Sequence, residues 1–231
     1  MKKVDENNVC CSQYHEPAKK NSPQPLLFKS LELFNQYKRK SVDNICWSQY
    51  NEQTKKNPPR SLLFKSLELF NQYKGKAVDI GCGAGNESVF LYDNGWDVLA
   101  VDKNAEGINN LREKYPQIQI QRSSFEDLSE LPKVDLVFSI PFCSPKYFDK
   151  FINVLLKSIN NNGRFAGNFF GLNDEWAKSR TNMTFCTIET VKSFFINFEI
   201  EYFNEVEFNR KKANGEDKYW HIIDIIARKI S

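Results

Sequence analysis

The stretch "KAVDIGCGAGNESVF", from Lys76 to Phe90, decides the fold. A short apolar run is followed by three glycines at alternate positions, and a segment of helical character follows them. Glycine lets a backbone turn sharply and pass close to a ligand, because no Cβ stands in the way. The stretch therefore predicts a strand, a tight turn and a helix, with a ligand bound at the N-terminus of that helix.

The spacing of the glycines narrows the class of ligand. Gly81, Gly83 and Gly85 form G-x-G-x-G, whereas dinucleotide-binding turns have G-x-G-x-x-G. Asp79 precedes the first glycine by two residues, and a carboxylate there would repel a pyrophosphate but can pair with a cationic amine. A nicotinamide-dependent oxidoreductase is therefore the weakest of the functions that we consider.

Two later segments extend the predicted site. Asp102 ends the apolar run "WDVLAVD", about 20 residues after the turn, where a carboxylate can accept hydrogen bonds from ribose hydroxyls. The alternative is that Asp102 caps the next helix. In "SSFEDL", Phe125 and Glu126 are candidates for packing on and reading an adenine, or else are a core and a surface residue.

Strand-like and helix-like segments alternate from Lys76 onward. Expected strands are 76–80, 96–102, 118–121, 134–140 and 164–171, with helices between them. This alternation predicts an α/β fold with a doubly wound, mostly parallel sheet covered on both faces. Two long strands, 198–208 and 219–230, should close the sheet as an antiparallel hairpin at its edge.

The N-terminal part contains a tandem duplication. Cys10–Asp43 and Cys46–Asp79 are identical at 25 of 34 positions, and "LLFKSLELFNQYK" occurs unchanged as Leu26–Lys38 and Leu62–Lys74. The second copy is expected to form a helix from Pro58 to Lys74 that ends at Gly75. The first copy has Arg39 in place of Gly75 and lacks the glycine turn. We therefore expect an extension over 1–45 and the functional domain over 46–231.

Composition excludes several classes of function. The net charge of +3 comes from residues 1–45, which carry 8 basic and 5 acidic residues against 24 and 24 in the remainder. A neutral domain argues against nucleic acid as the partner. No apolar run reaches the length of a membrane span, and no zinc-like spacing of Cys and His occurs. The six cysteines are expected to be reduced thiols of a cytoplasmic protein.

The motifs resemble a known family. "AVDIGCGAGNESVFL" and "GWDVLAVDKNAEGI" are similar to motifs I and II of class I S-adenosylmethionine-dependent methyltransferases, with a Rossmann-like fold. Later segments such as "DLVFSIPFCSP" and "KYWHIIDIIARK" resemble a bacterial branch near the tellurite-resistance and thiopurine-type enzymes. The resemblance covers Cys46–Lys229 and implies a seven-stranded sheet and S-adenosyl-L-methionine as cofactor.

Residue by residue, the resemblance implies a cofactor site. The methionine part would lie among Asp79, Gly81, Cys82 and Gly83, the ribose at Asp102 and Lys103, the adenine at Phe125 and Glu126, and the sulfonium beside Ser139. Many relatives have Asp at the place of Ser124, so one adenine contact differs. "SIPF", residues 139–142, only distantly resembles the Asn-Pro-Pro-Tyr signature of amino-group methylating enzymes, which argues against that chemistry.

The methyl acceptor is less well defined. Asp174, Glu175 and Tyr50 are weak candidates for a general base, and Trp47, Phe142, Phe170 and Trp176 for an apolar wall, although core packing explains these aromatic residues equally well. His221 lies in an apolar run and is expected to be structural. We expect a methyltransferase that acts on a small molecule; the alternative is a catalytically degenerate cofactor-binding regulatory or interaction module.

Overall fold

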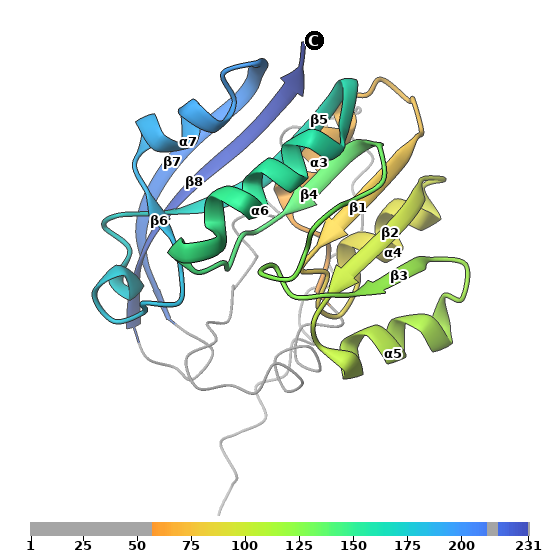
Figure 1. Ribbon diagram of the computed structural model, residues 1–231, viewed down its shortest axis with the longest axis horizontal. Coiled ribbons are helices and arrows are strands. Elements are labelled where there is room, and N and C mark those ends of the chain that lie inside the picture. The colour runs from red at the N-terminus through yellow and green to blue at the C-terminus, as the bar shows by residue number, and fades with distance from the viewer. Residues whose placement is uncertain (1–56, 212–216, 231) are drawn as a thin grey trace, which may run out of the picture.

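The computed structural model describes residues 57–211 and 217–230, which form one sheet with helices on both faces (Figure 1). The strands that run parallel to one another are β1 (Lys76–Ile80), β2 (Asp97–Asp102), β3 (Gln119–Arg122), β4 (Val134–Ser139), β5 (Ile159–Gly171) and the two-residue β6 (Phe185–Cys186). The antiparallel strands are β7 (Phe198–Lys211) and β8 (Asp217–Lys229).

The strand order is β3-β2-β1-β4-β5-β8-β7, and β6 pairs with β5 outside this path. The predicted doubly wound sheet of seven strands is therefore confirmed, with β6 as a short addition. β8 pairs antiparallel with both β5 and β7, so the last strand of the chain is inserted beside β5 and β7 forms the edge. The expected closing hairpin is also confirmed.

Helices cover both faces of the sheet. Leu62 of α3 (Ser61–Glu68), Leu91 of α4 (Asn86–Asp93) and Leu111 of α5 (Ala105–Lys114) belong to one buried cluster with β1, β2 and β4. The opposite face is covered by α6 (Pro145–Ser158) and α7 (Ile188–Phe194), as Figure 1 shows. β1 is an inner strand between β2 and β4, so the turn that follows it lies inside the carboxyl edge of the sheet and not at its border.

The helix before β1 is shorter than predicted. α3 spans Ser61–Glu68 rather than Pro58–Lys74, and the chain then turns through Asn71 and Gln72 with φ of 47° and 70°. This turn allows Phe70 to pack edge-on against Trp96, with ring centroids 5.0 Å apart. The N-cap is Arg60, so the helix begins after Pro58. Periodicity alone did not reveal the turn, because Phe70 keeps its helical spacing in the sequence while packing from a loop.

Gly75 was predicted to end the helix before β1, but its role in the structure is a different one. A Cβ at this position would lie 2.2 Å from Oδ2 of Asp135, which accepts a hydrogen bond from the Lys76 N–H at 2.9 Å. A glycine is needed here so that the chain can enter β1 beside this carboxylate. Arg39, at the matching place of the first copy, lies outside the described residues, as do Trp47 and Tyr50.

None of the described helices combines the length and the apolar character that crossing a bilayer requires.

Candidate functional site

The glycine turn after β1 has the conformation that its sequence demands. Gly81, Gly83 and Gly85 have φ of 78°, 55° and 83°, a left-handed region that side chains rarely adopt. The Gly81 N–H donates to the carbonyl of Val101 at 2.7 Å, which ties the turn to β2. A Cβ on Gly81 would lie 3.0 Å from Cζ of Phe125, and one on Gly85 would lie 2.8 Å from a methyl group of Leu111. The predicted strand, turn and helix are all present.

Asp102 connects the turn with the end of β2. One carboxylate oxygen accepts the Gly83 N–H at 2.9 Å, and the other accepts the Asn104 N–H at 2.7 Å. The helix that follows is capped by Asn104, whose side chain accepts the Gly107 N–H at 2.9 Å. The capping alternative for Asp102 is therefore wrong. Each oxygen of this half-buried carboxylate keeps a further lone pair, so both can still accept a hydroxyl.

Asp79 lies on the same edge but is deeply buried. Its side chain is 3% exposed and accepts a hydrogen bond from the Ser88 hydroxyl at 2.6 Å. Burial, and then the neighbouring Glu87 and Asp102 carboxylates, raise the pKa of Asp79 to about 7, against the lowering effects of Ser88 and Arg60. Two carboxylates thus act on a third at the glycine turn, and such a place favours a cation over a phosphate.

Glu87 and Arg60 were not among the predicted residues. Glu87, in the first turn of α4, is buried and accepts both the backbone N–H and the guanidinium of Arg60, at 3.2 and 2.8 Å. An acid directly after a glycine turn, at the N-terminus of a helix, is a signal that was readable in the sequence. Its arginine partner was not, because 27 residues separate the two.

The family comparison agrees with this geometry. The family model of the tellurite resistance protein TehB matches residues 49–216. This chain belongs to the TehB family. A search of curated proteins found no match.

Solved structures show the same fold at low sequence identity. TehB from Haemophilus influenzae is 18% identical, with a TM-score of 0.62 over 72% of this chain; the match spans only 62% of that chain. A 1,6-didemethyltoxoflavin-N1-methyltransferase from Burkholderia thailandensis, solved with S-adenosylhomocysteine, is 13% identical, with a TM-score of 0.57 over 93% of this chain and 94% of its own. A SAM-dependent methyltransferase from Methanosarcina mazei is 19% identical, with a TM-score of 0.53 over 71% and 97%.

The family and the fold are those of S-adenosylmethionine-dependent methyltransferases, which indicates S-adenosylmethionine as the cofactor. The residues at the glycine turn after β1 fit this cofactor. Exposed Gly81 leaves room where a Cβ would meet Phe125, and the surrounding carboxyl groups suit a sulfonium and an ammonium. Asp79, Gly81, Gly83 and Asp102 are brought together here, as predicted.

The other predicted cofactor residues have mixed surroundings. The ring of Phe125 lies 4.9 Å from that of Phe151 and borders Gly81, so it belongs partly to the core and partly to the edge of the turn. Glu126 is half-buried, and its carbonyl accepts from Lys150 at 3.3 Å. The side chain of Ser124 pairs with Asp127, at 2.7 Å, within a local turn. Lys103 is exposed beside Asp102.

Ser139 and Cys82 are both buried. The Ser139 hydroxyl donates to the carbonyl of Ile80 at 3.4 Å, across the junction of β4 and β1. Any contact that Ser139 makes with a ligand is therefore expected from its backbone. Burial, reinforced by Asp79, raises the pKa of the Cys82 thiol well above its usual range. This leaves Cys82 a neutral thiol and not a nucleophile.

The structure argues against Asp174 as a general base. Its carboxylate forms an ion pair with Lys218 at 2.5 Å, and both side chains are completely buried. It also accepts the backbone N–H groups of Trp176 and His221, at 3.0 and 3.1 Å. The Lys218 ammonium lies 3.7 Å from the Trp220 ring centroid and 4.2 Å from that of Trp176. Asp174 therefore joins η1 (Glu175–Lys178) to β8.

Glu175 and His221 also have structural partners. The carboxylate of exposed Glu175 accepts the Tyr219 N–H at 3.0 Å. Nδ1 of His221 accepts the Asn173 N–H at 3.1 Å, and its Nε2 lies 2.8 Å from Glu205. The ligand atoms of Glu205, Glu207 and His221 lie within 4.8 Å of one another, but these hydrogen bonds occupy both ring nitrogens without an ion. The histidine is buried and satisfied, as expected.

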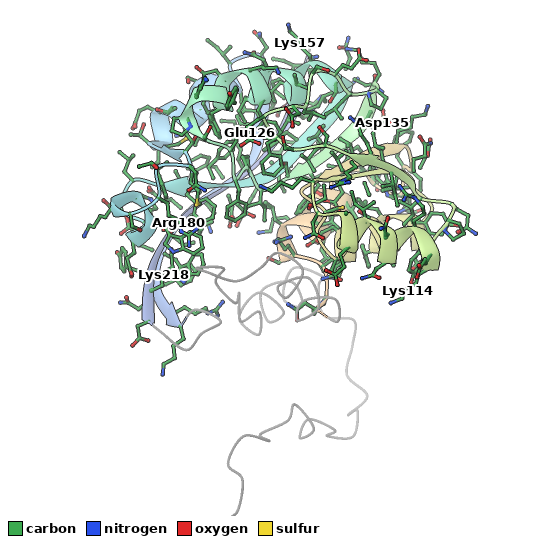
Figure 2. All side chains as sticks on the ribbon, turned by 60° about the horizontal axis from the view of Figure 1, so that its bottom comes forward. Lys114, Glu126, Asp135, Lys157, Arg180 and Lys218 are labelled. Atoms are coloured by element: carbon green, nitrogen blue, oxygen red, sulfur yellow. The ribbon has the colours of Figure 1, made fainter. Side chains whose placement is uncertain are left out.

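Aromatic residues gather at the carboxyl ends of β4 and β5. The Phe170 ring lies 5.1 Å from Phe142 and 5.9 Å from Trp176, and Trp176 lies 5.2 Å from Trp220. The guanidinium of Arg180 lies 4.6 Å from the Trp176 ring. Figure 2 shows Arg180 and Lys218 near one another on this side of the molecule, away from Lys114 on α5. The predicted apolar wall is thus assembled, apart from Trp47, and it also forms a core cluster of its own.

Proposed function

We propose that this chain transfers a methyl group from S-adenosyl-L-methionine to a small-molecule acceptor. The observation that carries the proposal is the Asp79 carboxyl group, on which the Glu87 and Asp102 carboxylates act, at a left-handed glycine turn. A cationic sulfonium and an ammonium are favoured there, and a pyrophosphate is disfavoured. The cofactor supplies a methyl group bound to a positively charged sulfur, and the protein has to hold and orient it.

The chain's own residues have separate tasks in this proposal. Asp102 accepts the ribose hydroxyls, Asp79 pairs with the amine, and the backbone of Gly81 and Gly83 lies against the methionine part. The aromatic cluster around Phe170 and Trp176 excludes water from the acceptor. Because methyl transfer leaves a neutral sulfur compound, alignment of donor and acceptor is the main requirement.

Binding of the cofactor is the first test. Calorimetry should show S-adenosylhomocysteine binding to the full chain, and Asp102→Asn should weaken it. Asp97→Asn is the matched control, because Asp97 is an exposed aspartate at the other end of the same strand. No binding by the wild-type protein, or equal losses in both variants, would contradict the proposal. Nicotinamide fluorescence that shifts on mixing would instead support an oxidoreductase.

Turnover is the second test. A panel of small amines, alcohols, thiols and oxyanions should be incubated with protein and S-adenosylmethionine, with S-adenosylhomocysteine as the product measured. Tellurite belongs in the panel because the matching family is described by tellurite resistance.

A degenerate binding module is the second candidate function. It is favoured by the engagement of Asp174 and Glu175 with η1 and β8, which removes two candidate bases. Tight cofactor binding without turnover on the whole panel would support this candidate.

A further inference from the structure

A row of polar side chains crosses an otherwise apolar part of the sheet. Asn168 of β5 is paired with Asp224 of β8, which in turn is paired with Asn204 of β7. Paired residues on neighbouring strands project from the same face of a sheet. The rows on either side are largely apolar, and they are made up of Ala166, Ile226 and Tyr202 on one side and Phe170, Ile222 and Val206 on the other.

The first two members of the row are buried. Asn168 is 1% exposed and Asp224 is 4% exposed. The Asn168 amide nitrogen donates to the Asp224 carboxylate. In the part of the chain that the structure describes, Oδ1 of Asn168 is buried without a hydrogen-bond partner. Buried polar atoms are nearly always bonded in native proteins, so this oxygen calls for a partner that residues 57–211 and 217–230 do not supply.

The position of Asn168 identifies the kind of partner. Gly167, the preceding residue, pairs with Ser139 at the end of β4, and Ser139 pairs with Ile80 directly before the glycine turn. Asn168 therefore lies one residue further toward the carboxyl edge, where open α/β sheets bind their ligands. It also shares a face with Asp79, because Asp79 pairs with Phe138, Phe138 pairs with Ala166, and side chains alternate along β5.

The other buried polar atom without a partner is less informative. Among residues 57–211 and 217–230 it is Nε1 of Trp96, which lies in the apolar cluster beneath α3, next to Phe70. Trp96 precedes β2 and so lies at the opposite edge of the sheet from the glycine turn. Of the residues that the structure describes, only Asn168 combines burial, a missing partner and a place beside the proposed position of the cofactor sulfonium.

We propose that Asn168 and Asp224 bind the hydrogen-bond donor of the methyl acceptor, an amine or a hydroxyl group that is neutral or positively charged. This inference rests on the proposed function and specifies its substrate class. Oδ1 of Asn168 and the Asp224 carboxylate are both hydrogen-bond acceptors, and the Asn168 amide nitrogen is already directed at Asp224. The pair therefore favours a donor and disfavours an anion. The Phe170 ring in the adjacent row, with Phe142 and Trp176 beside it, suits an acceptor that carries a ring.

Three matched probes test the inference: benzylamine, benzyl alcohol and benzoate. Their affinities are measured by ligand-observed NMR titration of the full chain, with and without S-adenosylhomocysteine. We expect the amine and the alcohol to bind at millimolar concentration, and benzoate to bind at least about tenfold more weakly. Benzoate binding as well as the amine, or no binding by the amine and the alcohol, would overturn the inference.

Two variants assign the binding to the pair. Asn168→Ala should weaken the amine and the alcohol alike, by about fivefold, as for the loss of one hydrogen bond. Asp224→Asn keeps the shape and removes the charge, so it should weaken benzylamine about tenfold and benzyl alcohol less than threefold. Asn209→Ala, an exposed asparagine on β7, is the control and should change neither. Equal effects of Asp224→Asn on both probes, or no effect of Asn168→Ala, would contradict the assignment.

Binding of S-adenosylhomocysteine separates this inference from the proposed function. Both variants should bind it within about twofold of the wild type, which also shows that they fold. If the wild type binds no S-adenosylhomocysteine, the proposed function fails. The difference in affinity between benzylamine and benzoate still tests whether Asn168 and Asp224 bind a hydrogen-bond donor.

Discussion

The glycine turn and the β5–β8–β7 half of the sheet hold their charged groups in different ways. At the turn, the carboxylate of Asp102 is held by the backbone N–H groups of Gly83 and Asn104. In the other half, Asp174 is held mainly by Lys218, whose ammonium lies between two tryptophan rings. The glycine turn is the open half, because Asp102 keeps lone pairs for a ligand. The β5–β8–β7 part is the closed half, because the ion pair with Lys218 already neutralises Asp174. The comparison teaches that an acid at the carboxyl edge is a site candidate only where no buried cation of the protein already neutralises it.

The largest expected effect tests the closed half. Lys218→Met should lower the free energy of unfolding by about 3–5 kcal/mol, because it leaves the Asp174 charge buried without its partner. Denaturant unfolding monitored by tryptophan fluorescence measures this. The double variant Lys218→Met with Asp174→Asn should recover a large part of the loss.

Glu175→Gln is the control, since Glu175 is exposed and follows Asp174 directly, in η1. Its effect on the free energy of unfolding should stay under about 0.5 kcal/mol. If Lys218→Met is as mild as this control, the pair is not a structural element and the comparison fails.

The second effect tests the open half. Asp102→Asn should weaken S-adenosylhomocysteine about 30-fold, which corresponds to about 2 kcal/mol, because it removes the charge that strengthens hydrogen bonds to the ribose. Calorimetry measures the affinity, and Asp97→Asn should stay within about twofold. A loss of stability without a loss of affinity would mean that Asp102 is as structural as Asp174.

The third effect concerns the protonation of Asp79. Its pKa is raised to about 7 by burial and by the neighbouring carboxyl groups, so the free protein holds a proton there at pH 6. An ammonium prefers the carboxylate, and the affinity for S-adenosylhomocysteine should rise about tenfold between pH 5.5 and 6.5 and level off above 7. Asp79→Asn should abolish this rise, whereas an unchanged pH profile in the variant would place the titrating group elsewhere.

The same shift has the opposite sign for stability. The folded pKa lies above the value of 3.8 for an ordinary aspartate, so the folded state binds the proton more tightly than the unfolded state does. The stability contributed by this proton is present below about pH 4 and is lost as the pH rises toward 7. The free energy of unfolding of the wild type should therefore fall relative to that of Asp79→Asn over this range.

The smallest effect concerns the duplicated segment. Deleting Met1–Asn44 should change the affinity for S-adenosylhomocysteine by less than about threefold, or about 0.7 kcal/mol, since the glycine turn follows only the second copy. Calorimetry on both chains checks this. A much larger loss would mean that the first copy helps to build the open half of the site. The boundary between residues 45 and 46 stays a prediction, because it lies outside the described residues.

The open half of the site was predictable from local sequence because its parts are close in the chain. Glycines with positive φ, an acid two residues before them and an acid at the end of the next strand lie within 24 residues, Asp79–Asp102. Local rules also predicted the order of strands and helices, including the closing hairpin. They were wrong about the end of the helix before β1, which was predicted at Lys74. The chain turns earlier, at Asn71 and Gln72, and this turn is stabilised by the distant contact between Phe70 and Trp96.

The sequence by itself determined the family, the doubly wound sheet and the turn that suits a sulfonium cofactor. The tertiary structure alone decided which acids are available. Asp174 and Lys218 are 44 residues apart, and Asn168 and Asp224 are 56 apart. β8 brings both pairs together by antiparallel pairing with β5 from the far end of the chain. Spacing in the sequence carries no signal for such contacts, because they depend on the register between strands that fold together only when the sheet closes.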